Sequence, residues 1–169
     1  MKSRLWYPQL DAYDAVRRMG LLLMRWRREP PSAERLFITD FYLATPSLIH
    51  NASLPQDVRD QLRSIQIPRP EASFITLPAA PILFQKMAEV QGTALRTMLA
   101  KGLLSTEEAK AGAYVHSEAG LSVFSNTLAA LVGERELEIA DFLIAFIAFV
   151  GDGSISELRR RTGLRRMAQ

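Results

Sequence analysis

Residues 33–45, which lie between Pro30-Pro31 and Pro46, constrain the fold more than any other segment of this chain. Proline is tolerated at the start of a helix but not within it, so the two proline sites bound a helical segment. Ser32 is a suitable cap for its first turn. The side chains are apolar nearly all round a helical projection, and such a helix has to be covered on every side. The sequence therefore predicts a central helix.

Asp40 is the main exception within this apolar helix. A buried carboxylate is costly unless it is paired or hydrogen-bonded. No second carboxylate lies near it in the sequence to form a catalytic pair. We therefore expect Asp40 to accept hydrogen bonds from a neighbouring helix rather than to act as a catalytic acid.

Proline, glycine and serine divide the rest of the chain into short helical segments. The periodicity and capping signals predict helices over residues 11–28, 55–64, 81–100, 124–132 and 134–150. Two short helices are also predicted, one capped by Ser105 or Thr106 and one that begins at Ser154 or Ser156. Residues 142–150 form the longest apolar run, which we assign to the core rather than to an interface.

A few segments are richer in residues that favour strands. Residues 112–117 and 121–124 suggest a small hairpin, and residues 72–76 a short strand. The predicted fold is mainly α, a multi-helix domain with a small β hairpin. A winged-helix-like unit would suit residues 81–124, although helical bundles give similar patterns. We expect one domain over residues 1–169, with a division into an N-terminal helical part (1–70) and a winged-helix-like part with a basic tail (71–169) as the alternative.

Composition excludes several classes of protein. Hydrophobic residues make up 48% and charged residues 23% of the 169 residues, as in ordinary globular proteins. The chain has no cysteine, which excludes disulfides, zinc–cysteine sites and thiol nucleophiles. The first eight residues lack the apolar core of a signal peptide, and the longest apolar run has nine residues where a membrane span needs about 20. We expect a cytoplasmic protein that does not enter membranes.

Positive charge is concentrated at the two ends of the sequence. Residues 1–29 and 156–169 each carry a net charge of +4, whereas residues 30–155 carry −5. Two interpretations stay open. The basic ends can contact phosphates or an acidic partner, or they can pair with the acidic middle of the same chain.

Arginines supply most of this charge, because only four of the 21 basic residues are lysines. Successive residues of a helix diverge by 100°, so the arginines after Ser156 cannot all face one ligand. Asp14 can pair with Arg17 or Arg18 at helical spacing. The candidates for contacts with a partner or nucleic acid are Arg159, Arg160, Arg161, Arg165 and Arg166, followed by Arg17, Arg18, Arg25 and Arg28.

The usual catalytic constellations are missing from the sequence. His50 and His116 are the two histidines; they lie 66 positions apart, and we interpret them as a loop or cap residue and a hairpin residue. No glycine-rich phosphate loop precedes a Lys-Ser/Thr pair, and no serine lies in a nucleophile elbow. The sequence therefore predicts a protein that is not an enzyme, with no cofactor, metal or small-molecule substrate.

Four blocks of sequence, in order along the chain, resemble one family. They are residues 7–15, residues 35–43 with Pro46 after them, residues 83–103, and the tail Arg161-Thr162-Gly163-Leu164. With these blocks the chain resembles the middle components of bacterial ABC-three-component systems, small accessory proteins that accompany SMC-like or Rad50-like ATPases.

The resemblance implies a function in an antiphage or anti-plasmid defence complex of the Lamassu type. In such a complex the small subunit would be a non-catalytic adaptor that bridges an SMC-like ABC ATPase and an effector nuclease, with DNA contacted through the complex. The alternative is a stand-alone DNA-binding regulator built on a winged helix.

Overall fold

α2 (Ala33–Ala44) is buried on nearly every side, as its apolar circumference requires. The computed structural model describes residues 7–72 and 77–166 of the chain. Ser32 caps α2, its hydroxyl oxygen accepting a hydrogen bond from the Arg35 backbone N–H at 3.3 Å. Leu36, Ile38 and Phe41 have no exposed surface. The prediction of a buried helix between the two proline sites is therefore confirmed.

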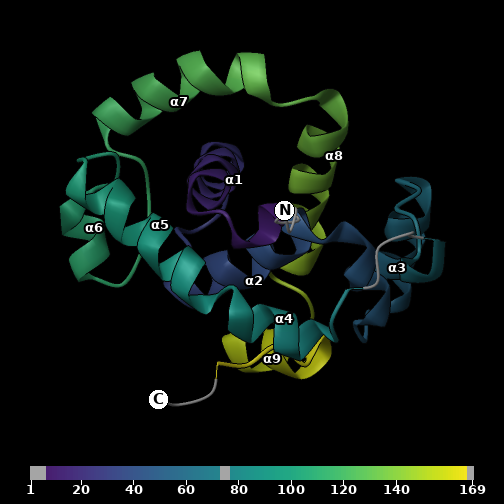
Figure 1. Ribbon diagram of the computed structural model, residues 1–169. Helices are drawn as coiled ribbons and strands as arrows, with labels where there is room; N and C mark the ends of the chain where they lie inside the picture. The colour runs from purple at the N-terminus through teal and green to yellow at the C-terminus, as the bar shows by residue number, and fades with distance from the viewer. Residues whose placement is uncertain (1–6, 73–76, 167–169) are drawn as a thin grey trace, which may run out of the picture.

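α1 (Ala12–Arg25) is the helix that the others surround. Asp11 caps it by accepting hydrogen bonds from the backbone N–H groups of Tyr13 and Asp14, at 2.8 and 3.1 Å. Figure 1 views α1 end-on, with α7 crossing on one side and α2, α5 and α8 around the rest. The helix ends three residues earlier than the predicted range of 11–28.

The remaining helices are mostly short. They are α3 (Gln56–Ser64), α4 (Ala80–Lys86), α5 (Ala88–Ala100), α6 (Thr106–Lys110), α7 (Glu118–Leu131), α8 (Glu134–Phe142) and α9 (Ile155–Thr162), with 3₁₀ turns at Pro8–Leu10, Pro46–Asn51 and Pro70–Ala72. The helix predicted over residues 81–100 is divided at Met87 into α4 and α5. Gly102 follows α5 with φ = 68°, a left-handed conformation that glycine adopts without strain.

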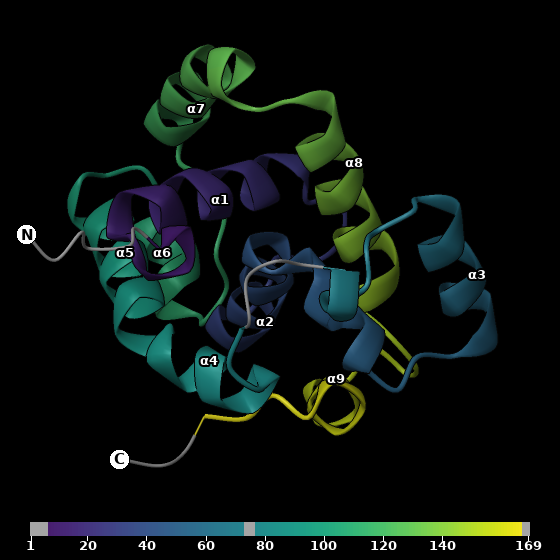
Figure 2. The same ribbon diagram turned by 45° about the vertical axis from the view of Figure 1, so that its right-hand side comes forward.

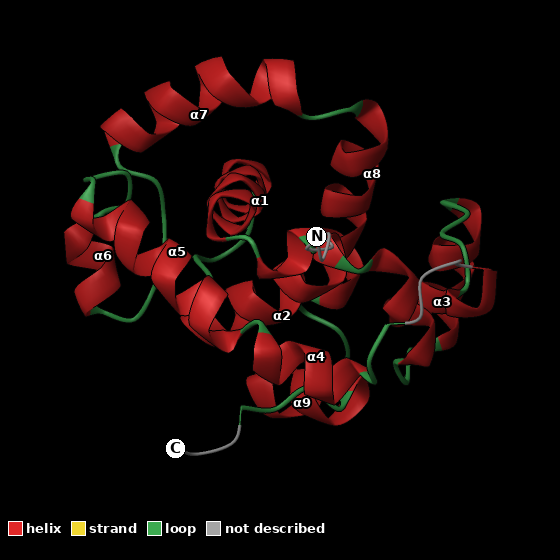
Figure 3. Cartoon of the chain, viewed as in Figure 1, coloured by secondary structure: helices red, strands yellow, loops and turns green. Residues whose placement is uncertain are grey.

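The predicted β hairpin is wrong. Residues 121–124 lie within α7, which begins where the Ser117 hydroxyl accepts a hydrogen bond from the Gly120 backbone N–H at 3.0 Å. Figure 3 shows no strand in the described residues, 7–72 and 77–166. The only strand-like pairing within these residues is one isolated antiparallel bridge, between Leu104 and His116. The winged-helix unit depended on this hairpin and has no support in that part of the chain. The strand predicted over residues 72–76 lies outside the described residues, apart from Ala72.

Residues 142–150 belong to the core, as predicted. α8 continues into a π-helical turn over Leu143–Ile147, and Phe142, Ile144 and Val150 are buried. Gly151 and Gly153, both with positive φ, then reverse the chain into α9. Among the helices of residues 7–72 and 77–166, none is long and apolar enough to cross a membrane.

The outer helices lie at opposite sides of the bundle. α7 stays at the periphery in both Figures 1 and 2, whereas α9 and the residues after it run beside α4. α1 packs against α5 and α7, so contacts cross the suggested division at residue 70. The domain assignment itself stays a prediction.

Gly120 allows α7 to approach the chain before it. A Cβ atom added at Gly120 would lie 1.9 Å from the backbone oxygen of Leu103, which cannot move aside as a flexible side chain can. We expect Gly120→Ala to lower the free energy of unfolding by about 1–3 kcal/mol, the usual cost of overpacking. Chemical denaturation measures this change.

Gly92→Ala is the matched control, because Gly92 is also helical but faces only the mobile end of the Arg96 side chain. Alanine is favoured over glycine within a helix by about 0.5–1 kcal/mol, so this variant should be slightly more stable than the parent protein. Equal effects of the two substitutions would contradict the packing described for α7.

Candidate interaction surfaces

A buried ion pair joins α1 to α2. The Arg18 side chain is 2% exposed and that of Asp40 is 0% exposed. The Arg18 Nε donates to Asp40 Oδ1 at 2.7 Å, and its Nη1 also donates to Asp14. Asp40 is therefore a hydrogen-bond acceptor between helices, as predicted. Arg18, one of the candidates for contacts with a partner or nucleic acid, lies in the interior instead.

The pair continues into a longer polar network. Gln91 of α5 donates from Nε2 to Asp40 Oδ2 at 2.8 Å and to the Phe37 carbonyl at 2.9 Å. The side-chain oxygen of Gln91 accepts a hydrogen bond from Arg166, which follows α9. Burial alone would lower the pKa of Arg18, but its ion pairs with Asp40 and Asp14 more than offset that effect and raise the pKa. The network thus keeps charge inside the bundle.

The other candidate arginines near α1 are also engaged within the chain. Arg17 bonds Asp14 and Glu136, both at 2.8 Å, and Arg25 bonds Asp141 at 2.7 Å. The guanidinium carbon of Arg28 lies 3.8 Å from the centre of the Phe149 ring, a cation–π contact.

The arginines of α9 point in different directions, as the helical geometry predicts. Arg159 bonds Glu34 of α2, whereas Arg160 and Arg161 both bond Glu157 within α9. The pair of Arg159 with Glu34 and those of Arg17 with Glu136 and Arg25 with Asp141 join the basic ends to acidic groups elsewhere in the chain. Contact between any of these arginines and a partner stays a prediction.

Arg165 and Arg166 differ from the other arginines of the tail. Arg165 is exposed, and its side chain has no partner among residues 7–72 and 77–166. The Arg166 guanidinium is half-buried, stacked 3.7 Å from the centre of the Phe84 ring. Burial lowers the pKa of Arg166 to about 10.

The two histidines contact backbone carbonyls in separate places. His50 Nε2 lies 2.8 Å from the Ile67 oxygen, and His116 Nε2 lies 2.9 Å from the Gly20 oxygen. His116 lies in the loop before α7 and not on a hairpin. The described part of the chain contains no group of three or more acidic, histidine or cysteine side chains that could hold a metal ion.

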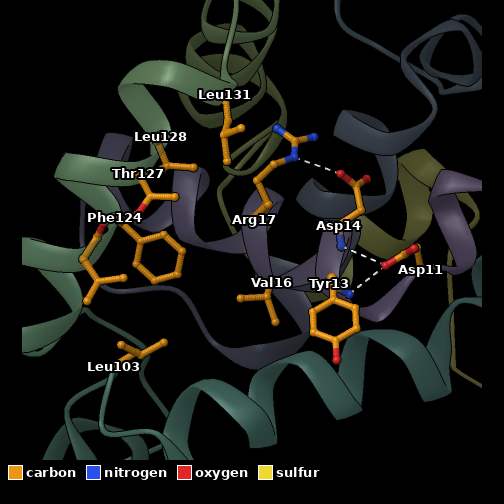
Figure 4. Close-up of a pocket in the computed structure, with 11 residues that line it drawn as sticks. Asp11, Tyr13, Asp14, Val16, Arg17, Leu103, Phe124, Thr127, Leu128 and Leu131 are labelled. Atoms are coloured by element: carbon orange, nitrogen blue, oxygen red, sulfur yellow. Dashed lines mark hydrogen bonds and ion pairs between the residues drawn. The ribbon is translucent and has the colours of Figure 1, made fainter.

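An apolar groove runs between α1 and α7 (Figure 4). We call it the α1–α7 groove; its volume is about 460 Å³ and its apolar wall consists of Val16, Leu103, Val123, Phe124, Leu128 and Leu131. Asp11, Asp14 and Arg17 lie along one edge. Because Arg17 is paired with Asp14 and Glu136, the charges at this edge are largely satisfied within the chain.

Large apolar side chains around this groove are open to solvent. Tyr13 is 89% exposed, Leu131 59% and Val123 47%. Of the 14 residues of α7, three are buried, namely Gly120, Phe124 and Leu128, which follow one another at the four-residue helical spacing. This surface was not predicted from the sequence, because residues 121–124 were expected to form part of a hairpin.

The ion pair of Arg18 and Asp40 can be separated experimentally from the exposed pairs. Asp40→Asn leaves Arg18 buried with only Asp14 as a charged partner. We expect a loss of about 3 kcal/mol in the free energy of unfolding, as is usual when one member of a buried pair is removed. Denaturant titration of the purified variant measures it.

Asp141→Asn provides the comparison, because the pair of Asp141 with Arg25 is about 40% exposed on each side. Removing a surface ion pair costs under about 1 kcal/mol. If Asp40→Asn were no more harmful than Asp141→Asn, the buried network would not have the structural importance assigned to it.

Comparison with known proteins identifies the family. A family model described as ABC-three component (ABC-3C) system Middle Component 5 matches residues 4–167. No curated protein and no solved structure gives a significant match. The family match covers nearly the whole chain and includes all four blocks noted in the sequence. The chain therefore belongs to the Middle Component 5 family of the ABC-three component systems.

Proposed function

We propose that this protein is a non-catalytic adaptor of an ABC-three component system, and that it docks on another component through the α1–α7 groove. The exposed apolar wall of that groove carries the proposal. Contiguous apolar surface on a soluble domain is usually a contact site for another macromolecule. Membership of a family named for its place in a three-component system supports a partner protein as the occupant.

α7 is suited to such a contact. Phe124 and Leu128 pack against the bundle, whereas Leu121, Val123 and Leu131 of the same helix are 48%, 47% and 59% exposed. Its only charged residue is Glu118, at its first position. A partner helix can therefore pack along α7 and α1 without burying an unpaired charge from α7, which would cost several kcal/mol.

The proposed partners are those that the family resemblance implies. They are an SMC-like ABC ATPase and an effector nuclease of a Lamassu-type antiphage or anti-plasmid system in the cytoplasm. The adaptor would hold the effector on the ATPase until engagement of DNA shifts the assembly to another state. This mechanism requires the effector to bind one of the two states of the assembly more tightly than the other.

The absence of catalysis is part of the proposal. In the described part of the chain, the Nε2 atoms of His50 and His116 each lie within hydrogen-bond distance of a backbone carbonyl oxygen. The carboxylates that form ion pairs are spread over several elements rather than gathered in the groove. The alternative, a stand-alone DNA-binding regulator, was based on a hairpin whose second strand, residues 121–124, is helical in the structure.

A double substitution in α7 tests the docking surface. We expect Val123→Lys with Leu131→Lys to reduce binding of the partner component by at least about tenfold, since desolvating two lysines in an apolar contact is unfavourable. Both residues are exposed, so the stability of the isolated protein should change by no more than about 0.5 kcal/mol. Co-purification with the proposed ABC ATPase, followed by titration, measures the effect.

Ile82→Lys is the control, because Ile82 is an apolar residue of α4 that is 55% exposed and lies outside the groove. It should bind the partner as the parent protein does. Equal loss with the control and the groove variant, or full binding by both, would overturn the assignment of the groove.

A further inference from the structure

A second pocket lies on α2, α9 and the residues that follow α9, away from the α1–α7 groove. Its volume is about 360 Å³, and it is lined by Ala33, Glu34, Phe37, Arg159, Arg165 and Arg166. We call it the arginine pocket. The lining contains three arginines and one glutamate, so its formal net charge is +2.

Arg159 is the arginine whose charge is compensated. Its Nε donates to Glu34 Oε1 at 2.5 Å, and its Nη2 donates to the other oxygen of the same carboxylate. This two-point contact fixes Arg159 and uses the one acidic group of the lining. Among the residues that the structure describes, Arg165 and Arg166 therefore have no directly bonded anion.

Arg166 is held in place by neutral acceptors. It donates to the Phe84 carbonyl and to the Gln91 side-chain oxygen, and it stacks on the Phe84 ring. Burial lowers the pKa of Arg166, whereas the hydrogen bond to Glu34 raises the pKa of Arg159. The opposite directions of these two pKa shifts agree with the geometry, since of the two arginines only Arg159 is bonded to a carboxylate.

Arg165 supplies a side chain that is free to bind. Gln85 of α4 donates to the Arg165 carbonyl, so the backbone is anchored beside the pocket. The side chain itself is exposed and bonds nothing in residues 7–72 and 77–166. An anchored backbone with an unpaired guanidinium suits the capture of an anion at small cost in backbone entropy.

We propose that the arginine pocket binds a phosphate dianion, either as inorganic phosphate or as the terminal phosphate of a nucleotide. A phosphate monoester carries a charge of about −1.5 to −2 near neutral pH, which matches the net +2 of the lining. Guanidinium groups bind phosphate oxygens through paired N–H donors. This site is separate from the docking groove, and the inference does not depend on the proposed adaptor function.

In the part of the tail that the structure describes, the arginines without a carboxylate partner are Arg165 and Arg166, and both line the pocket. On α9, Arg160 and Arg161 are both paired with Glu157, so the tail does not present a continuous row of free cations. Binding to duplex DNA gains affinity from several phosphates contacted together. A single recess with two uncompensated arginines favours one compact dianion instead.

Calorimetric titration of the full chain tests the proposal. Inorganic phosphate and adenosine 5′-monophosphate should each bind saturably with one-to-one stoichiometry, and adenosine and acetate should not. Arg165→Ala should weaken phosphate binding by about tenfold, the effect of losing one charge-assisted hydrogen bond. Tighter binding of the monophosphate than of phosphate would identify a nucleotide as the source, and equal binding would identify the free ion; either result supports the site.

Two further variants make the test specific. Glu34→Gln retains a side-chain oxygen for Arg159 but raises the net charge of the lining to +3, so phosphate should bind more tightly. Arg160→Ala removes an arginine of α9 outside the pocket and should leave binding unchanged. The proposal is overturned if phosphate does not bind, if Arg160→Ala weakens binding as much as Arg165→Ala does, or if only a long oligonucleotide binds.

Discussion

The buried pair of Arg18 and Asp40 is the interaction on which the arrangement of the helices depends. Apolar contacts favour burial but not one register over another, because they are not directional. A carboxylate with no exposed surface, in contrast, has to receive its donors at defined distances. Asp40 receives them from α1 and α5 together, so the positions of three helices are coupled at one residue. We regard this specification of register as the main role of the network.

Features that depend on neighbouring residues could be predicted from the sequence. Ser32 caps its helix as predicted, and Ser105 and Ser154, each one of two predicted caps, also accept a backbone hydrogen bond. The prediction of a hairpin was wrong because it relied on the preference of individual residues for strands. Residues 121–124 carry branched and aromatic side chains that favour strands, but Ser117 caps a helix, and the burial of Phe124 and Leu128 against α1 decides the conformation.

The arginines show what the sequence could not decide. Charge along the chain allowed either contacts with a partner or pairing within the chain. The choice depends on contacts such as that of Arg17 with Glu136 or Arg159 with Glu34, whose members are more than 100 residues apart. Asp14 and Glu157 both pair with arginines at helical spacing; the pairs of Asp14 were predicted, and those of Glu157 were not. The arginine pocket could not be recognised either, because its lining comes from two distant segments.

The groove and the pocket are joined by one continuous series of polar contacts. Asp14 lines the groove and bonds Arg18, which in turn bonds Asp40. Gln91 bonds both Asp40 and Arg166, and Arg166 lines the pocket. The bonds of Arg166 to neutral acceptors are the ones with which a bound anion competes. Coupling between two sites requires an element with two arrangements that both ligands bias, and it is reciprocal where it exists. Arg166 is the member of the series that can change partners without leaving a carboxylate buried and unpaired, so any coupling between the two sites would act through it.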